Sequence, residues 1–175
     1  MTKSTKEQIQ KDEQKILAEL MKNSKESIDM IAKNCGFSRQ KAWRMIKQLK
    51  RDQKIWGYTA IVDLEMQDMK KFILSIKRSG QPLDKKSMNE IAYEKLEKII
   101  SSLGVTIESS YFIHGEYDWM LIFMAKDIQY AKKFATTLLN AYPGIVSKVD
   151  IAQILYTQRD HRVANPDQSK LMEFL

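Results

Sequence analysis

One segment of the chain is rich in groups that bind polyanions. Between Ser38 and Lys54 there are seven basic residues and a single acidic residue, Asp52. Long cationic side chains bind the phosphates of double-stranded DNA, and arginine or glutamine near the start of a helix can hydrogen-bond the edges of bases. The candidate DNA-binding residues are Ser38, Arg39, Gln40, Lys41, Trp43, Arg44, Lys47, Lys50, Arg51 and Lys54.

The spacing within this segment predicts a helix over residues 39–52 with two different faces. An apolar stripe repeats at helical intervals through Ala42, Met45, Ile46 and Leu49, so most of the cations lie on the other side. We expect the early polar side chains to read bases and the cations from Lys47 onward to contact phosphates. A cationic helix face is by itself often only a solvated surface. The ring of Trp43 suits packing on another element or chain as well as contact with a thymine methyl group.

The distribution of charge along the chain favours DNA binding over a merely solvated helix. Residues 1–60 hold 14 basic and 7 acidic residues, whereas residues 61–175 hold 15 of each. The whole net charge of +7 therefore belongs to the first third of the chain. This asymmetry predicts a polyanion-binding module joined to a unit with a different role.

Two further helices are predicted ahead of the cationic one. Amphipathic patterns run over residues 9–21 and 28–35, and Gly36 supplies a residue that tolerates left-handed geometry after the second helix. Ser38 can then cap the third helix. Two helices that meet at a tight glycine turn form a helix-turn-helix. The β-branched and aromatic residues 55–62 predict a following strand that serves as a wing or linker, so the first domain is expected to span residues 1–62.

Residues 63–160 predict a second domain with the element order β-α-β-β-α-β. Strands are expected at residues 72–76, 105–113, 119–125 and 146–156. The first helix begins at a capping box of Ser87 and Glu90 and ends at Gly104, and the second begins at Asp127. This order is typical of a ferredoxin-like fold, so the chain as a whole is expected to be α+β.

The last strand of this domain carries apolar residues on both faces, which predicts an association between copies of the chain. A sheet with helices on one side only leaves its other face to be covered by a second chain. In a homodimer, two recognition helices related by a two-fold axis would read two half-sites on DNA. For the tail, residues 161–175, docking on a neighbouring chain and disorder both remain open.

The composition also excludes several classes of protein. A single cysteine, Cys35, cannot form an internal disulfide, and no cleavable signal pattern opens the chain, so we expect a cytoplasmic protein. The longest apolar stretch, residues 119–125, is far shorter than the roughly 20 residues of a membrane-spanning helix. With His114 and His161 as the only histidines, no metal site is expected. No nucleotide-binding glycine motif is present, so no cofactor is expected either.

The chain resembles the Lrp/AsnC (feast/famine) transcriptional regulators over about residues 9–160. The resemblance is carried by the stretch IAKNCGFS, the spaced Ala42, Ile46 and Leu49, the segment IWGYTAIVD, Gly115 and Asp118 in GEYD, and Pro143 and Gly144 in PGIV. It implies a winged helix-turn-helix joined to a ferredoxin-like effector and dimerisation domain, and no enzymatic activity. The sequence departs from the family pattern at Met45, Gln53 and Asp150, where the family usually has arginine, glycine, and threonine or serine.

The resemblance also implies a place for a small-molecule effector such as an amino acid. In these regulators the effector binds near the loop that contains the glycine and aspartate, so the candidate effector-binding residues here are His114, Gly115, Tyr117 and Asp118. Two alternatives remain open. Some tetrapyrrole (sirohaem) decarboxylases resemble the same architecture, with His114, Tyr117 and Asp118 as catalytic suspects, although a turn cap and a surface histidine are the commoner roles. The second alternative is a protein that coats DNA with little sequence preference.

Overall fold

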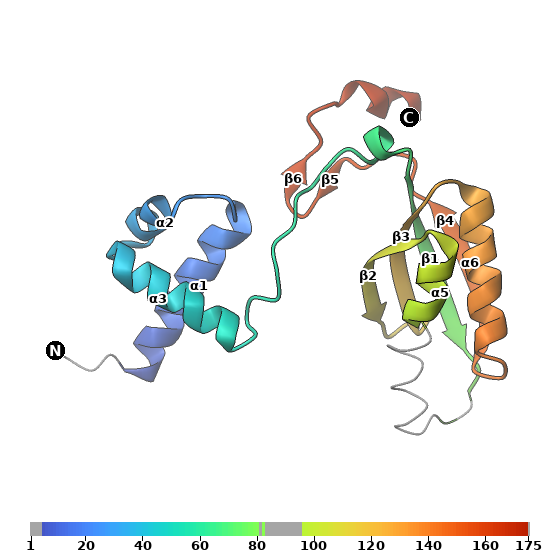
Figure 1. Cartoon of the computed structure of the whole chain (residues 1–175), viewed down its shortest axis with the longest axis horizontal. Coiled ribbons are helices and arrows are strands. Elements are labelled where there is room, and N and C mark those ends of the chain that lie inside the picture. Colours follow the sequence, from blue (N-terminus) through green and yellow to red (C-terminus); the bar gives the residue numbers. More distant parts are fainter. Residues whose placement is uncertain (1–4, 81, 83–95, 175) are drawn as a thin grey trace. The chain divides into compact units, whose positions relative to one another are not determined.

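The structure, a computed structural model, describes residues 5–80, 82 and 96–174. They fall into two units, Met1–Ile61 and Val62–Leu175 (Figure 1). Each unit has its own hydrophobic core. Within the described ranges no helix combines the length and the apolar character needed to cross a membrane.

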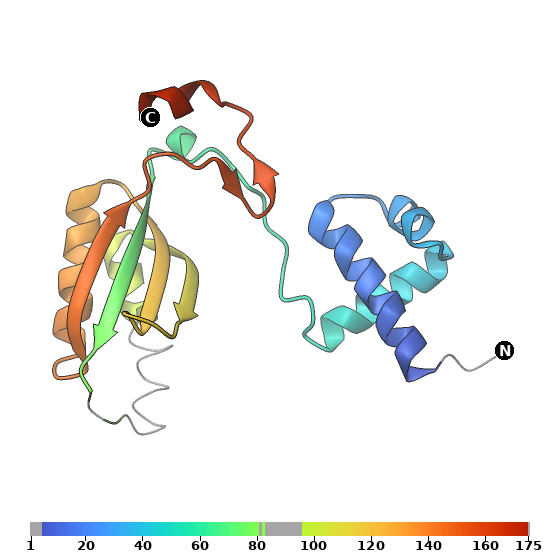
Figure 2. The same cartoon turned by 180° about the vertical axis from the view of Figure 1, so that it is seen from behind.

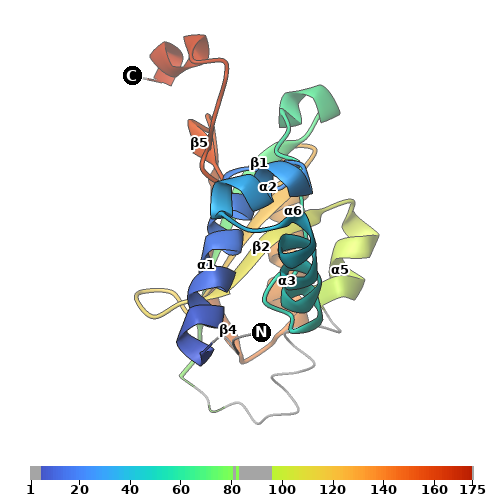
Figure 3. The ribbon, with the colours of Figure 1, turned by 90° about the vertical axis from the view of Figure 1, so that its left-hand side faces the viewer.

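The first unit consists of three helices, α1 (Lys6–Lys22), α2 (Ile28–Cys35) and α3 (Arg39–Arg51). They pack against one another, with α2 at the end where α1 finishes and α3 starts (Figure 3). Thr5, Ser27 and Ser38 cap the three helices, because each side-chain oxygen accepts a hydrogen bond from a backbone N–H three residues further on. The predicted helices are therefore confirmed.

The turn between α2 and α3 depends on Gly36. Its φ of 70° is left-handed, and its backbone N–H donates to the carbonyls of Ala32 and Lys33 at the end of α2. Ile31, Ala32 and Cys35 from α2 then share the core with Ile16, Ala42 and Leu49. Burial raises the pKa of the Cys35 thiol, which is consistent with its predicted role in the core.

The strand predicted at residues 55–62 is wrong. In the part of the chain that the structure describes, residues 55–63 pair with no strand, and Trp56 is 96% exposed. Ile55 instead donates its backbone N–H to the carbonyl of Leu49 and packs against the core of the first unit. Side-chain types alone do not make a strand, because its backbone groups also need a neighbouring strand for hydrogen bonding.

The second unit contains a four-stranded antiparallel sheet. Its strands are β1 (Lys70–Arg78), β2 (Thr106–Phe112), β3 (Trp119–Ala125) and β4 (Val146–Gln153), in the order β2-β3-β1-β4. A short 3-10 helix, η1 (Leu64–Gln67), precedes β1. Helices α5 (Leu96–Leu103) and α6 (Ile128–Ala141) lie on one face of the sheet, and Figure 2 shows the opposite face in front of them. The predicted α+β, ferredoxin-like fold is confirmed.

Local signals around these elements have mixed outcomes. Asp127 caps α6 as predicted, accepting hydrogen bonds from the backbone N–H groups of Gln129 and Tyr130. Gly104 has the left-handed φ of 63° expected after α5. The predicted capping box of Ser87 and Glu90 lies outside the described residues.

The core of the second unit lies between the sheet and its helices. Along β3 the burial alternates strictly, so Trp119, Leu121, Phe123 and Ala125 are buried and the residues between them are partly exposed. The Phe123 ring is central, with its centroid 5.4 Å from that of Phe72 in β1 and 5.0 Å from that of Phe134 in α6. On the other face lie the partly exposed Ile73, Met120, Ile122 and Met124 and the exposed Ala152, which together are called the open face below.

The C-terminal segment departs from the prediction in two ways. The last strand, β4, ends at Gln153 and not near residue 156, and the Tyr156 hydroxyl beyond it donates to the carbonyl of Asp167. The tail then forms a small hairpin of β5 (Arg159–Asp160) and β6 (Val163–Ala164), followed by a 3-10 helix, η3 (Ser169–Phe174). Within its described residues the tail is thus folded onto its own chain.

Candidate nucleic-acid interface

Most of the cations predicted to bind DNA lie on the exposed side of α3, called its outer face below. Ala42 and Leu49 point into the core, whereas Gln40, Arg44 and Lys47 are exposed on the other side of the helix. Met45 and Ile46 pack partly against the core, as their spacing predicted. The remaining exposed residues of the predicted set are Ser38, Arg39, Trp43, Lys50, Arg51 and Lys54. An exposed cationic face on the second helix of a helix-turn-helix has the chemistry required to enter the major groove.

Three of these cations are held by acidic residues of α1 and α2. Lys41 Nζ lies 2.5 Å from Asp12 Oδ2, and Lys54 Nζ lies 2.6 Å from Glu13 Oε2. Arg39 forms a more exposed pair with Asp29, at 3.1 Å. Sequence reasoning placed all three cations in the DNA-binding set and did not consider these partners.

Among the residues that the structure describes, Asp12 is a charged residue that is buried, with 4% of its surface exposed. Besides the ammonium of Lys41, it accepts a hydrogen bond of 2.8 Å from Gln8 Nε2. The ammonium of Lys41 also lies 4.1 Å from the centroid of the Phe37 ring. The hydrogen bond from Lys41 lowers the pKa of Asp12, against the opposing effect of burial. These contacts fix the first turn of α3 to α1. Asp12 lies four residues before the buried Ile16, a spacing that places both on one helix face.

Substitution of Asp12 by asparagine is expected to lower the stability of the first unit at pH 7 by about 1.5–3 kcal/mol, because the hydrogen bond from Lys41 loses its charged acceptor. Since the folded-state pKa of Asp12 is lowered, its contribution is fully present above about pH 4, the ordinary range of aspartate. It is lost as the pH falls through the lowered pKa. Denaturant unfolding between pH 7 and pH 3 measures this loss.

The control for this experiment is Asp29→Asn, which removes an exposed ion pair and should keep the wild-type pH profile. An Asp12→Asn variant whose stability follows the wild-type protein at every pH would contradict the assignment.

Two further cations lie over aromatic rings. Lys47 Nζ is 4.1 Å from the centroid of the Trp43 ring, and Lys50 Nζ is 4.7 Å from that of Tyr58. Arg44 donates from Nε to the carbonyl of Gln40 at 3.4 Å. The side chains along this part of α3 border an open depression of about 550 Å³. The outer face of α3 therefore presents its cations and one aromatic ring in a defined arrangement.

The predicted effector loop, residues 114–118, does not form one cluster. Asp118 forms two hydrogen bonds with the backbone of β1. Its Oδ2 accepts from the N–H of Arg78 at 2.8 Å, and its own N–H donates to the carbonyl of Ile76. His114 and Gly115 are exposed. The Asp118 carboxylate thus accepts a hydrogen bond from the backbone of a neighbouring strand, a contact that the sequence does not reveal.

Tyr117 meets two residues of β4 that were not in the predicted set. Its hydroxyl donates to Asp150 Oδ2 at 2.5 Å, and Lys148 Nζ lies 2.7 Å from the same carboxylate oxygen. Hydrogen bonding to Asp150 raises the pKa of both Tyr117 and Lys148, and hydrogen bonding from Lys148 lowers the pKa of Asp150. This trio brings a hydroxyl, an ammonium and a carboxylate together beside the open face of the sheet.

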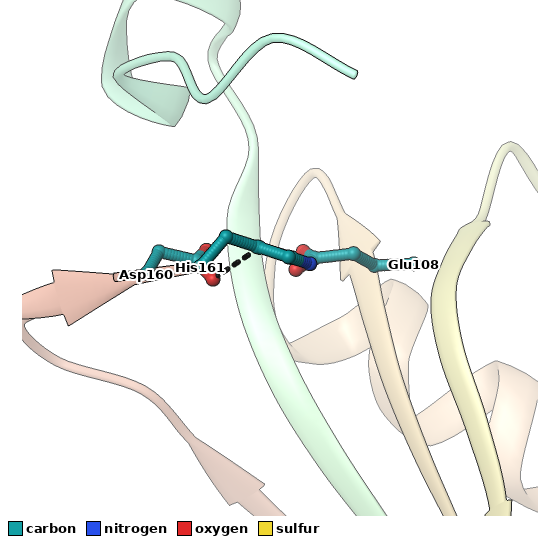
Figure 4. Close-up of side chains that lie close together, drawn as sticks. All are labelled: Glu108, Asp160 and His161. Carbon is teal, nitrogen blue, oxygen red and sulfur yellow. Dashed lines mark hydrogen bonds and ion pairs between the residues drawn. The ribbon is translucent and has the colours of Figure 1, made fainter. Parts of the chain in front are cut away.

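A second polar cluster joins the C-terminal hairpin to the sheet. Glu108, Asp160 and His161 offer three ligand atoms within 4.8 Å of one another (Figure 4). The ammonium of Lys71, however, lies 2.7 Å from each of the two carboxylates and would have to be displaced by a cation. Burial opposes the charge on Lys71, yet hydrogen bonds to the carboxylates raise its pKa. The geometry fits an anchor for the hairpin better than a metal site.

Comparison with known proteins matches both units. A family model described as "Winged helix-turn-helix DNA-binding" matches residues 13–55. The leucine-responsive regulatory protein of Haemophilus influenzae is 28% identical over 135 residues, which cover 75% of each protein. The resemblance to the Lrp/AsnC family is therefore confirmed.

Solved structures of the Lrp/AsnC type share the fold over nearly the whole chain. A feast or famine regulatory protein from M. tuberculosis, solved with L-methionine, superposes with a TM-score of 0.68 at 18% identity and covers 90% of this chain and 99% of that one. An AsnC family transcriptional regulator from Agrobacterium tumefaciens gives a TM-score of 0.62 at 19% identity, with 92% and 97% covered. The Lrp/AsnC-like fold therefore extends across the helical unit and the sheet.

Proposed function

We propose that this chain is a sequence-specific, DNA-binding transcriptional regulator of the Lrp/AsnC type that acts as a homo-oligomer. The observation that carries the proposal is the exposed cationic outer face of α3 within a helix-turn-helix. A helix of this kind supplies both phosphate contacts and base contacts when it lies in the major groove. The name of the relative from Haemophilus influenzae supports the regulatory part of the proposal.

The contacts within the first unit divide its cations into two groups. Lys41 and Lys54 have their ammonium groups on Asp12 and Glu13, so we assign them to holding α3 against α1. Gln40 and Arg44 lie in the first half of α3, where a recognition helix reads bases. The phosphate contacts are assigned to Lys47, Lys50, Arg51, and to Ser38 and Arg39 at the start of the helix.

We assign the homo-oligomer interface to the open face of the sheet. Its residues, Ile73, Met120, Ile122, Met124 and Ala152, are partly or fully exposed and lie on three neighbouring strands. A second copy of the chain would remove this apolar surface from water. Sedimentation or light scattering should then give a mass of at least two chains, and Ile122→Lys should reduce it to one.

The effector is assigned to the region of the Tyr117 trio. A hydroxyl, an ammonium and a carboxylate beside one another match the opposite charges of an amino acid. The structural relative from M. tuberculosis was solved with L-methionine, which makes methionine the first compound to test. Isothermal titration with methionine and other amino acids should give binding that Asp150→Asn abolishes.

The decisive experiment is fluorescence anisotropy of the full chain with DNA from upstream of its own gene and with a scrambled duplex, each across a salt series. A preference of about a thousandfold for the native fragment at physiological salt would support sequence-specific regulation. Equal and steeply salt-dependent affinity for both duplexes would indicate a protein that coats DNA. Absence of binding to either duplex would refute the proposal.

A further inference from the structure

Trp43 is an exposed aromatic side chain among the cations of α3. Its surface is 46% exposed, and it is absent from the residues that pack in the core of the first unit. Its neighbours on the outer face of α3 include Arg44 and Lys47. Exposing an indole ring among cations has a cost in water, because the apolar surface stays hydrated. The position therefore suits a ring that becomes buried when the surface is occupied.

The ring is held on the outer face by a contact within the same helix. Lys47 follows Trp43 by four residues, and its ammonium lies 4.1 Å from the ring centroid. With this contact in place, 46% of the Trp43 surface is still exposed. The contact also places a cation beside the ring, so an apolar contact of Trp43 and a phosphate contact of Lys47 can be made together.

The major groove of DNA offers one kind of apolar group to such a ring. The edges of the bases carry hydrogen-bond donors and acceptors, and the methyl group at C5 of thymine is the exception. Trp43 lies five residues after the cap Ser38, in the half of α3 from which a recognition helix contacts bases. The apolar surface of the ring thus matches thymine methyl groups better than any other feature of the groove.

We propose that Trp43 determines part of the sequence specificity by packing on thymine methyl groups in the major groove. This inference rests on the proposed DNA-binding function. Burial of one methyl group is worth about a fourfold change in affinity, so each thymine contacted by Trp43 should contribute a preference of about that size over uracil. Uracil differs from thymine only by this methyl group and keeps all the hydrogen-bonding groups.

The test compares an alternating d(A-T) duplex with the same duplex in which every thymine is replaced by deoxyuridine. The full chain should bind the thymine duplex about fourfold more tightly or better, and Trp43→Ala should bind both duplexes equally. Trp56→Ala is the matched control, because Trp56 is 96% exposed but lies outside α3, and it should keep the preference. Thermal melting checks that each variant is folded.

A second probe locates the contact. Duplexes that the full chain selects from a randomised pool are prepared with deoxyuridine in place of some thymines. Positions at which deoxyuridine is depleted from the bound fraction mark the methyl groups that contribute to affinity. These positions should disappear from the pattern of Trp43→Ala. Equal binding of thymine and uracil duplexes by the wild-type chain, or a thymine preference retained by Trp43→Ala, would overturn this inference but not the proposed function. Binding to neither duplex at low salt would refute the proposed function and this inference with it.

Discussion

Substitution of Arg44 by alanine is expected to weaken binding to the native DNA fragment by about 5- to 150-fold. Arg44 is exposed in the first half of α3, where its guanidinium can form two hydrogen bonds to a guanine. Loss of such a base contact costs about 1–3 kcal/mol and affects the correct sequence more than a scrambled one. The ratio of the two affinities, measured by anisotropy at one fixed salt concentration, should therefore fall.

Substitutions of two lysines provide the controls for Arg44→Ala. Lys50→Ala should weaken binding to the native and the scrambled duplex about equally and reduce the slope of log affinity against log salt by about 1, because a phosphate contact is lost. Lys54→Met should leave that slope unchanged, since its ammonium lies on Glu13. Equal effects of all three substitutions on both duplexes would show that Arg44 is not part of the base-reading surface.

The structural features that could be predicted from the sequence are those determined by neighbouring residues. Ser27, Ser38 and Asp127 cap helices through hydrogen bonds to backbone groups two or three residues away, and Gly36 ends a helix through its own φ. The alternating burial of β3 likewise follows from the period of a strand. Such signals are visible in any window of about ten residues, which explains why the three helices of the first unit and the order of the sheet strands in the second were predicted correctly.

The features that could not be predicted are contacts between distant parts of the chain. Lys41 is 29 residues from Asp12, and Lys54 is 41 residues from Glu13, so nothing in the cationic segment indicates that these two lysines are already paired. The contact of Tyr117 with Asp150 spans 33 residues and depends on the position of β4 in the sheet. The predicted strand at residues 55–62 is wrong for a related reason, since a strand forms only where a partner strand is available.

These pairings change the interpretation of the charge on the recognition helix. The cationic segment has a large excess of positive charge in sequence, but part of it is neutralised at the junction of α1 and α3. The number of phosphate contacts, and hence the salt dependence of DNA binding, should therefore be smaller than the sequence suggests. Base recognition requires α3 to keep a constant orientation, and the acidic residues of α1 help to hold it in place.

Substitution of Phe123 by alanine is expected to destabilise the second unit by about 3–5 kcal/mol. The side chain is fully buried, and its ring packs against Phe72 and Phe134, so truncation leaves a cavity between the sheet and α6. Guanidinium unfolding, followed by the emission of Trp119 in a chain whose Trp43 and Trp56 are replaced by phenylalanine, measures the loss. Because Phe123 packs within one chain, the stability lost in Phe123→Ala should not depend on protein concentration. The stability lost in Ile122→Ala, on the open face, should shrink as the protein is diluted. A loss below about 1 kcal/mol for Phe123→Ala would contradict this account of the core, and equal concentration dependence of both variants would contradict the assignment of the two faces.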